Sequence, residues 1–249
     1  MPSSLVVEKL QGVAPAGAYT PRGNNRRLFY ERAPEVLLEG PAGTGKSRAV
    51  LEKLHLLCLK YPNLRCLIVR KTRESITQSA QFTLEREVMV PAQSTPFNHE
   101  AQEYRYPNGS RIVLCGMDKP SKVLSSQYDV AYYQEATEGL EEEVEVINTR
   151  LRNGKLAYQQ LILDCNPDAP EHWLNLRCER GACLRLETRH EDNPAVTPEY
   201  LARLDALTGW RHKRFRLGLW VAAEGMYFEE WDPDRHICEP FDVPKHWTR

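Results

Sequence analysis

The hydrophobic residues of this chain form four short runs that suit buried strands, separated by stretches with helical spacing. The runs lie at residues 36–38, 66–69, 130–133 and 161–163. Helices are expected over residues 47–61, where apolar residues recur at steps of three and four, and in an acidic segment over about residues 139–151. Another helix is expected to follow residues 70–73 and to run to about residue 88. This alternation predicts a mostly parallel sheet with helices on both faces.

Two further local signals add to this pattern. Residues 107–110 read Pro-Asn-Gly-Ser, and Asn and Gly tolerate the positive φ of tight turns, so they predict a hairpin between strands at 103–106 and 111–114. Thr197 and Pro198 suit the N-cap and first position of a helix that we expect to end at Gly209. Residues 19–23 read as an extended turn that leads into the first strand.

Composition narrows the class of protein. The chain has 249 residues, 41% hydrophobic and 27% charged, which predicts one principal soluble core. The formal net charge of -1 means that any contact with nucleic acid must come from local basic patches. No apolar run approaches the roughly 18 residues that span a bilayer, so we expect no membrane protein. The seven cysteines lack paired spacing and no apolar leader is visible, which favours a reducing cytoplasm.

One stretch carries a recognisable chemistry. A pattern of the form G-x-x-x-x-G-K-[ST] is satisfied by Gly40, Pro41, Ala42, Gly43, Thr44, Gly45, Lys46 and Ser47, between a predicted strand and a predicted helix. Its glycines let backbone N–H groups approach phosphate closely. We expect Lys46 to reach the β- and γ-phosphates of a nucleoside triphosphate, with ATP as the expected ligand, and Ser47 to ligate Mg²⁺. The alternative is a glycine-rich turn without a ligand.

A second candidate site follows the strand at residues 130–133. Glu135 stands where a carboxylate could polarise the attacking water. Gln134 stands where such hydrolases place an acid for Mg²⁺, yet an amide offers only its carbonyl oxygen. We therefore expect Ser47 and Gln134 at the metal ion, with Asp129 nearby as a further acid. The alternative is that Glu135 only caps or solvates a strand end.

Asn166 follows the next predicted strand. Ligands of open α/β sheets bind beyond the carboxyl ends of the strands, so Asn166 could hydrogen-bond a γ-phosphate or the attacking water. An Asn-Pro turn without phosphate contact is the alternative.

Together these motifs resemble the ATPase domain of a tailed-bacteriophage terminase large subunit. The resemblance covers about residues 19–241 and includes further segments in the order of that family: 70–72, 149–152, 172–174, 192–194, 218–220 and 225–227. It implies a P-loop NTPase of the ASCE type, α/β with a mostly parallel central sheet flanked by helices and a small helical subdomain. Many such terminases have an acid-acid pair where this chain has Gln134 and Glu135.

The resemblance also implies a function. The chain would bind ATP and Mg²⁺ and hydrolyse ATP to drive double-stranded DNA into a procapsid, in the cytoplasm of the infected host cell. Lys46 and Ser47 would hold phosphate and Mg²⁺, Glu135 would be the catalytic carboxylate and Asn166 part of the coupling motif. Arg22 lies in the segment where the family places adenine contacts.

Such motors are rings in which one subunit supplies a positive group to its neighbour's nucleotide. The expected partners are other copies of the chain, double-stranded DNA, a portal protein and a small terminase subunit. Candidates for the group acting in trans are Arg150 and Arg152, then Arg70 and Lys122, although each could instead form a surface salt bridge. A basic cluster that could touch DNA, or be a solvated helix face, contains Arg211, Lys213, Arg214 and Arg216.

The resulting division of the chain has three parts. They are an N-terminal segment at residues 1–34, a P-loop ATPase core at 35–190, and a helical subdomain with a linker at 191–249. Family members continue into a nuclease domain, so we expect this chain to lack nuclease activity. The rival interpretations are a nucleotide-binding regulatory module with little turnover and a P-loop kinase. A metal site at Cys178, Cys183, Cys238 and His236 is disfavoured because close C-x-x-C pairs are missing.

Overall fold

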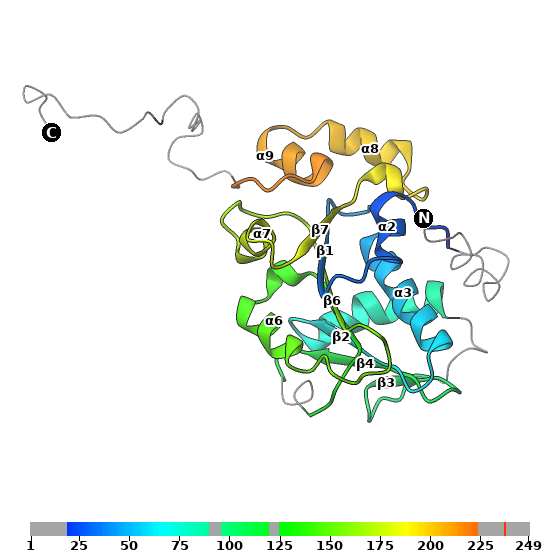
Figure 1. The fold of residues 1–249 in the computed structure, drawn as a ribbon. Coiled ribbons are helices and arrows are strands. Elements are labelled where there is room, and N and C mark those ends of the chain that lie inside the picture. The colour runs from blue at the N-terminus through cyan, green and yellow to red at the C-terminus, as the bar shows by residue number, and fades with distance from the viewer. Residues whose placement is uncertain (1–18, 90–95, 120–124, 224–236, 238–249) are drawn as a thin grey trace, which may run out of the picture.

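The computed structural model describes residues 19–89, 96–119, 125–223 and 237 (Figure 1). Within these residues seven strands form one sheet: β1 Glu35–Glu39, β2 Arg65–Arg70, β3 Glu103–Arg105, β4 Arg111–Gly116, β5 Val130–Tyr133, β6 Gln160–Cys165 and β7 Leu184–Glu187. Their order is β3-β4-β2-β5-β6-β1-β7. Neighbouring strands are parallel except β3, which is antiparallel to β4. The predicted parallel sheet and its hairpin are both confirmed.

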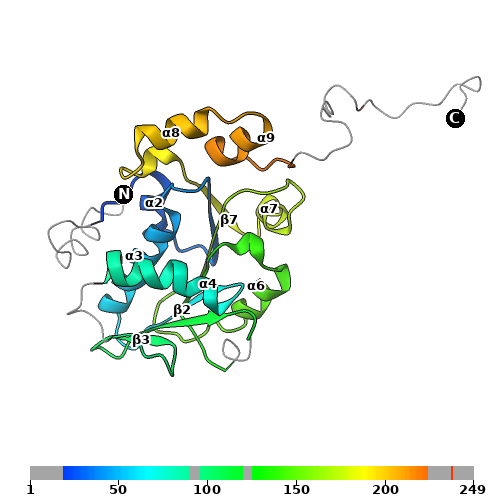
Figure 2. The same ribbon diagram turned by 180° about the vertical axis from the view of Figure 1, so that it is seen from behind.

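Helices cover the two faces of the sheet, as Figure 1 and Figure 2 show from opposite sides. The α-helices are α2 Gly23–Leu28, α3 Lys46–Lys60, α4 Arg73–Ile76, α6 Glu141–Asn148, α7 Trp173–Glu179, α8 Pro198–Asp205 and α9 Gly209–His212. Shorter helical segments are η1 Thr77–Gln81, η2 Leu84–Val88, η3 Ala136–Glu138, η4 His190–Asp192 and η5 Lys213–Leu217. Among the described helices, none has both the length and the apolar character needed to cross a membrane.

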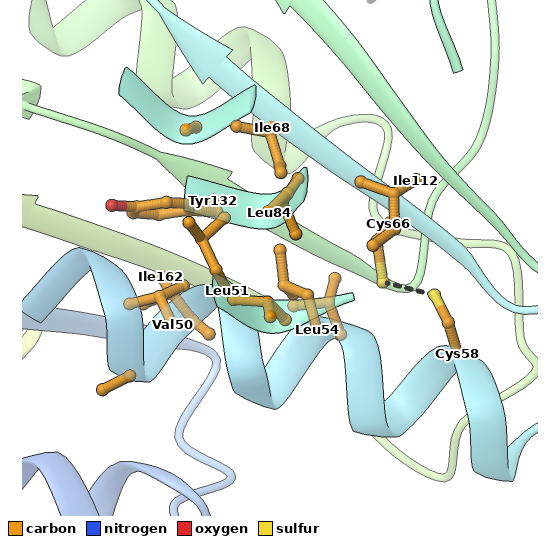
Figure 3. Packing of buried hydrophobic residues seen from close by; sticks show 14 of the residues in the cluster. Val50, Leu51, Leu54, Cys58, Cys66, Ile68, Leu84, Ile112, Tyr132 and Ile162 are labelled. Atoms are coloured by element: carbon orange, nitrogen blue, oxygen red, sulfur yellow. Dashed lines mark hydrogen bonds between the residues drawn. The ribbon is translucent and has the colours of Figure 1, made fainter. Parts of the chain in front are cut away.

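Two apolar layers hold the sheet between its helices. Successive side chains of a strand point to opposite faces, so Val36 and Leu38 pack toward α3, while Leu37 packs toward α6 and α7. Figure 3 shows the first layer, in which Leu51 and Leu54 of α3 lie against the central strands. Burial on both faces explains why these strands read as continuous apolar runs. Each fully buried leucine contributes roughly 1.5–3 kcal/mol.

Several local predictions were wrong or incomplete. The segment after Tyr19 does not run extended into β1, because α2 intervenes. Thr197 caps α8 as predicted, accepting a hydrogen bond from the Tyr200 backbone N–H, but α8 ends at Asp205. Gly209, with φ +58°, begins α9 instead of ending α8. Strand β7 and helix α7 were not predicted; the alternating Leu-Arg-Leu-Glu of β7 belongs to an edge strand.

The candidate residues lie together at one end of the sheet, where the parallel strands have their carboxyl ends. The phosphate loop follows β1, Glu135 follows β5, and Asn166 follows β6. Strand β6 lies between β1 and β5, so one additional strand separates the loop from the strand that delivers Glu135. This arrangement confirms the expected P-loop fold and forms the crevice in which such sheets bind ligands.

Candidate nucleotide-binding site

The phosphate loop has the backbone conformation that its glycines allow. Gly40, Gly43 and Gly45 have φ angles of +146°, +84° and +84°. A side chain on Gly40 would lie 2.3 Å from the carbonyl oxygen of Thr188, so no other residue fits there without displacement. Gly45 is the N-cap of α3, which places the free N–H groups of the first turn of that helix beside the loop.

Side chains from distant segments hold the loop from outside. The Asn25 side chain of α2 donates to the carbonyl of Thr44 (2.8 Å), and the Asn193 side chain donates to the carbonyl of Gly43 (2.7 Å). His190 Nε2 lies 3.0 Å from the carbonyl of Ala42 and must donate to it. Sequence reasoning did not assign these roles, although Asn193 lies in one of the segments that carried the resemblance.

Lys46 lies folded against the loop. Its Nζ donates to the carbonyls of Gly40 (2.7 Å) and Pro41 (2.9 Å) and to Asn166 Oδ1 (3.1 Å). Burial lowers the pKa of Lys46, and the charges of Asp164 and Glu135 oppose this effect. Its three donors therefore have three acceptors at the place where phosphate oxygens would bind.

Asn166 joins Lys46 to Glu135. Its Nδ2 donates to Glu135 Oε2 (3.4 Å) while its Oδ1 accepts from Lys46. Glu135 has φ +51°, a left-handed conformation that is uncommon outside glycine and concentrates at functional sites. Lys46 at the start of α3, Glu135 after β5 and Asn166 after β6 are thus brought into one constellation.

The surroundings of Glu135 suit a proton acceptor. Burial, followed by the charge of Asp164, raises the pKa of Glu135 to about 7, while Lys46 and Arg70 act in the opposite direction. A carboxyl group with a pKa near neutrality can accept a proton from water and release it again.

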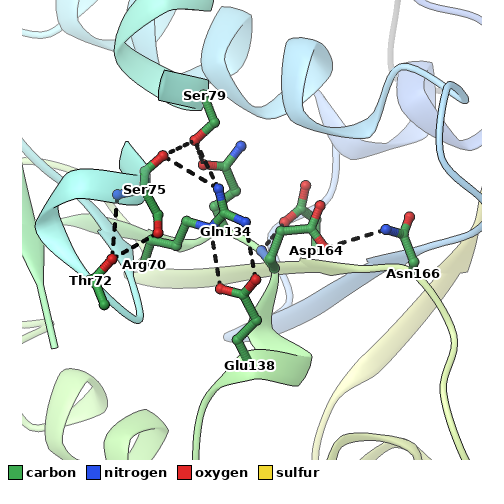
Figure 4. Close-up of polar contacts among 9 residues, drawn as sticks. Arg70, Thr72, Ser75, Ser79, Gln134, Glu138, Asp164 and Asn166 are labelled. Atoms are coloured by element: carbon green, nitrogen blue, oxygen red, sulfur yellow. Dashed lines mark hydrogen bonds and ion pairs between the residues drawn. The ribbon is translucent and has the colours of Figure 1, made fainter. Parts of the chain in front are cut away.

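Gln134 does not face Ser47. Its Oε1 accepts a hydrogen bond from Ser79 Oγ of η1 (2.8 Å), and its side chain is buried (Figure 4). Asp129 precedes β5 and so lies at the opposite edge of the sheet, where it accepts from the backbone N–H groups of Arg65 and Lys155. The expectation that Asp129 lies near the metal site is therefore wrong.

Ser47 contacts a different acid. Its Oγ donates to Asp164 Oδ2 (2.8 Å). The Ser47 hydroxyl is a hard oxygen donor, which suits Mg²⁺ when triphosphate oxygens and water complete the shell of the ion. Within the described part of the chain, no group of three His, Cys, Asp or Glu residues could hold a metal ion by itself. Cys178 and Cys183 are free thiols, and the other two residues of the disfavoured metal site, Cys238 and His236, lie outside the described residues.

A cavity of about 190 Å³ marks the site. It is lined by residues 42–48 together with Glu135 and Asn166. A larger cavity, of about 430 Å³, lies on the other side of the loop beside β7 and residues 216–220. The larger cavity contains neither Lys46 nor Glu135, so the smaller one is where the chemistry can occur.

The candidate arginines lie in different surroundings. Arg22 is exposed at the start of α2, the helix that reaches the phosphate loop through Asn25. Arg70 ends β2 at the same edge as Glu135 and pairs with Glu138 (3.1 Å), so it faces the site of its own subunit. Arg150 and Arg152 follow α6, and the Arg150 carbonyl accepts from Tyr128 just before β5. These two lie where β5 begins, at the end of the sheet opposite their own phosphate loop. Lys122 lies outside the described residues.

Two members of the basic cluster form ion pairs with acidic residues of the chain. Arg214 pairs with Asp168 (2.8 Å), and Arg216 pairs with Asp205 (2.6 Å). The Arg211 guanidinium lies 5.0 Å from the centre of the Trp210 ring. Arg214 and Arg216 therefore hold the helical segment to the core and to α8.

Comparison with known proteins gives a consistent picture. The family model for the phage terminase large subunit matches residues 33–197. The large terminase of a thermophilic bacteriophage is similar in structure, with a TM-score of 0.68 and 16% identity over 91% of this chain and 60% of that one. The same protein in complex with ATP-gamma-S gives a TM-score of 0.63 and 18% identity over 90% and 59% of the two chains.

The ATPase domain of the Thermus phage P74-26 large terminase is also similar, with a TM-score of 0.62 and 15% identity over 88% of this chain and 99% of that domain. No curated protein matches the chain significantly. The chain spans 60% of the length of the thermophilic bacteriophage terminase. At this level of identity the solved structures show a shared fold, while the family model covers more than half of the sequence. The chain belongs to the phage terminase large subunit family.

Proposed function

We propose that this chain is the ATPase motor domain of a viral large terminase, which hydrolyses ATP to drive double-stranded DNA into a procapsid. The observation that carries the proposal is the convergence of Lys46, Asn166 and Glu135 on the phosphate loop. The large terminase of the thermophilic bacteriophage has been solved in complex with ADP and with ATP-gamma-S, which supports a nucleotide as the ligand of this fold.

Each residue has a chemical part in this proposal. The N–H groups of the loop and the first turn of α3 bind phosphate oxygens, and Lys46 exchanges its loop carbonyls for the β- and γ-phosphates. Glu135 accepts a proton from the attacking water, and Asn166 orients Glu135 relative to Lys46. Ser47 would hold Mg²⁺, which supplies positive charge to the triphosphate.

The proposed partners follow from the same assignment. Other copies of the chain would form a ring, in which Arg150 or Arg152 stabilises charge on a neighbour's γ-phosphate. Double-stranded DNA would pass through the ring, and a portal protein and a small terminase subunit would connect it to the capsid and to the DNA. Arg22 and α2 would lie beside the adenine.

The experiment that tests this proposal is steady-state phosphate release from ATP and Mg²⁺ as the protein concentration is raised. Wild type is compared with Glu135→Ala and with Arg150→Ala. Activity that climbs faster than protein concentration and is lost in both variants supports a motor completed by its neighbour. Activity proportional to concentration and unchanged in Arg150→Ala would refute the assignment of that arginine.

One observation favours a second candidate, a nucleotide-binding module with little turnover. Gln134 carries no charge and its carbonyl faces Ser79, so the strand that delivers Glu135 brings no acid to Ser47. This candidate predicts that ATP binds without phosphate release at any protein concentration, and that Glu135→Ala binds ATP as wild type does.

A further inference from the structure

The sheet geometry places an unassigned carboxylate beside Ser47. Ile162 packs on the α3 face of β6, and Asp164, two residues later, points to the same face because strand side chains alternate. In register, Asp164 lies opposite Leu38 of β1, two residues before the phosphate loop begins at Gly40. The first turn of α3 therefore brings Ser47 Oγ to 2.8 Å from Asp164 Oδ2.

Asp164 is buried with hydrogen-bond donors but without a cation bonded to it. Only 1% of the residue is exposed. Besides Ser47, the Tyr132 hydroxyl donates to Oδ2 (2.8 Å) and the backbone N–H of Glu135 donates to Oδ1 (2.7 Å). Among the described residues these three donors are its hydrogen-bond partners, and the charge of Lys46 acts on it without a direct bond. A buried carboxylate of this kind gains strongly from a nearby positive ion.

Gln134 has neither the charge nor the position for this role. It shares the α3 face with Asp164, since it continues the alternation of Tyr132 in β5, but β5 is one strand further from β1 than β6 is. Its amide oxygen is already bonded to Ser79 (2.8 Å). The negative charge that Gln134 lacks is thus present one strand closer to the loop.

We propose that Asp164 supplies the carboxylate of the Mg²⁺ site in this chain, in place of an acid at Gln134. By accepting the hydroxyl hydrogen of Ser47, Asp164 turns the lone pairs of Ser47 Oγ away from itself and makes them available to the cation. Its charge also offsets that of the ion. Asp164 acts through Ser47 as a positioning residue, and this inference rests on the proposed ATPase function.

The test compares nucleotide affinity with and without Mg²⁺. Binding of ATP-γ-S is measured by titration calorimetry in excess Mg²⁺ and again in EDTA, so that the ratio of the two dissociation constants gives the gain due to the ion. Asp164→Asn, which keeps the shape and removes the charge, should lower this gain by about 10–100-fold. Gln134→Ala should keep the wild-type gain. Tyr132→Phe removes one hydrogen bond from the same carboxylate and should also keep it.

Several results would overturn the inference. Equal weakening of Asp164→Asn in Mg²⁺ and in EDTA would show that the residue only supports the fold. If Gln134→Ala loses the gain in affinity from Mg²⁺, the metal role belongs to Gln134 and not to Asp164. This variant therefore tests the inference even if Asp164→Asn does not fold. The wild-type protein distinguishes failure of the proposed function from failure of this inference. If it binds no ATP-γ-S in either condition, both are overturned. If it hydrolyses ATP and Asp164→Asn keeps the full gain in affinity from Mg²⁺, only the inference about Asp164 is overturned.

Discussion

Replacing Arg177 with methionine should destabilise the fold by leaving a buried carboxylate without its ion-pair partner. Arg177 of α7 donates from Nε and from Nη2 (3.0 Å) to the two oxygens of Glu35, at the start of β1. The Glu35 side chain is 6% exposed and that of Arg177 is 11% exposed. Arg177 also pairs with Glu141 and Glu145 of α6, so one guanidinium ties both helices of this face to the strand that leads to the phosphate loop.

The expected loss follows from what remains after the change. Removing one partner of a buried ion pair costs about 3–5 kcal/mol. Asn148 Nδ2 still donates to Glu35 Oε2 (3.2 Å), so we expect the lower end of this range, about 3 kcal/mol. At roughly 2–4 °C per kcal/mol for a chain of this size, the melting temperature should fall by roughly 6–12 °C.

The assay is urea unfolding followed by tryptophan fluorescence, with a thermal melt in parallel. The matched control is Arg180→Met, because Arg180 follows the last residue of the same helix, is 60% exposed and, among the described residues, forms an ion pair only with Glu141. This change should lower the free energy of unfolding by less than about 1 kcal/mol. The double variant Glu35→Gln, Arg177→Met should recover part of the lost free energy of unfolding, since it leaves no unpaired buried charge at this position. An Arg177→Met shift no larger than that of Arg180→Met would refute this reasoning.

Three further predictions concern the site and its surface. Gly40→Ala should abolish nucleotide binding because its side chain would collide with the Thr188 carbonyl, whereas Gly154→Ala, with nothing within 4 Å, should leave the affinity measured by calorimetry unchanged. Asn166→Ala should slow phosphate release by about 10²-fold because Lys46 and Glu135 lose their common partner, and a rate within twofold of wild type would exclude this role. Arg211→Ala with Lys213→Ala should weaken duplex DNA binding by an assembled motor and reduce its salt dependence, while unchanged binding and an unchanged salt slope would remove this pair from the DNA surface.

The central sheet could be predicted because its strands are buried on both faces. Such strands read as apolar runs, and the glycine pattern after the first run fixed the position of the phosphate loop. The edge strand β7 could not be found in this way, because its four residues alternate and three of them are not fully buried. Gly209 was assigned to the wrong end of a helix, since glycine permits the positive φ needed at either boundary.

The contacts around the loop were less accessible to sequence reasoning. Asn193 and His190 bind loop carbonyls across about 150 residues of chain, and no local pattern predicts that approach. Asp164 could have been found: alternation along β6 places it on the face of α3, toward Ser47. It was missed because the pair Gln134-Glu135 stands where the acids were expected, so Gln134 after β5 was assigned to the metal ion. Asp129 was then expected nearby, although it lies at the other end of that strand.

A comparison of binding and hydrolysis in Glu135→Gln bears most directly on the proposed ATPase chemistry. This change keeps the size of the side chain and removes the carboxylate that Asn166 orients. We expect phosphate release from ATP and Mg²⁺ to fall by about 10²–10⁴-fold while the affinity for ATP-γ-S stays within a few-fold of wild type. Phosphate release at the wild-type rate in Glu135→Gln would contradict the claim that this constellation hydrolyses ATP.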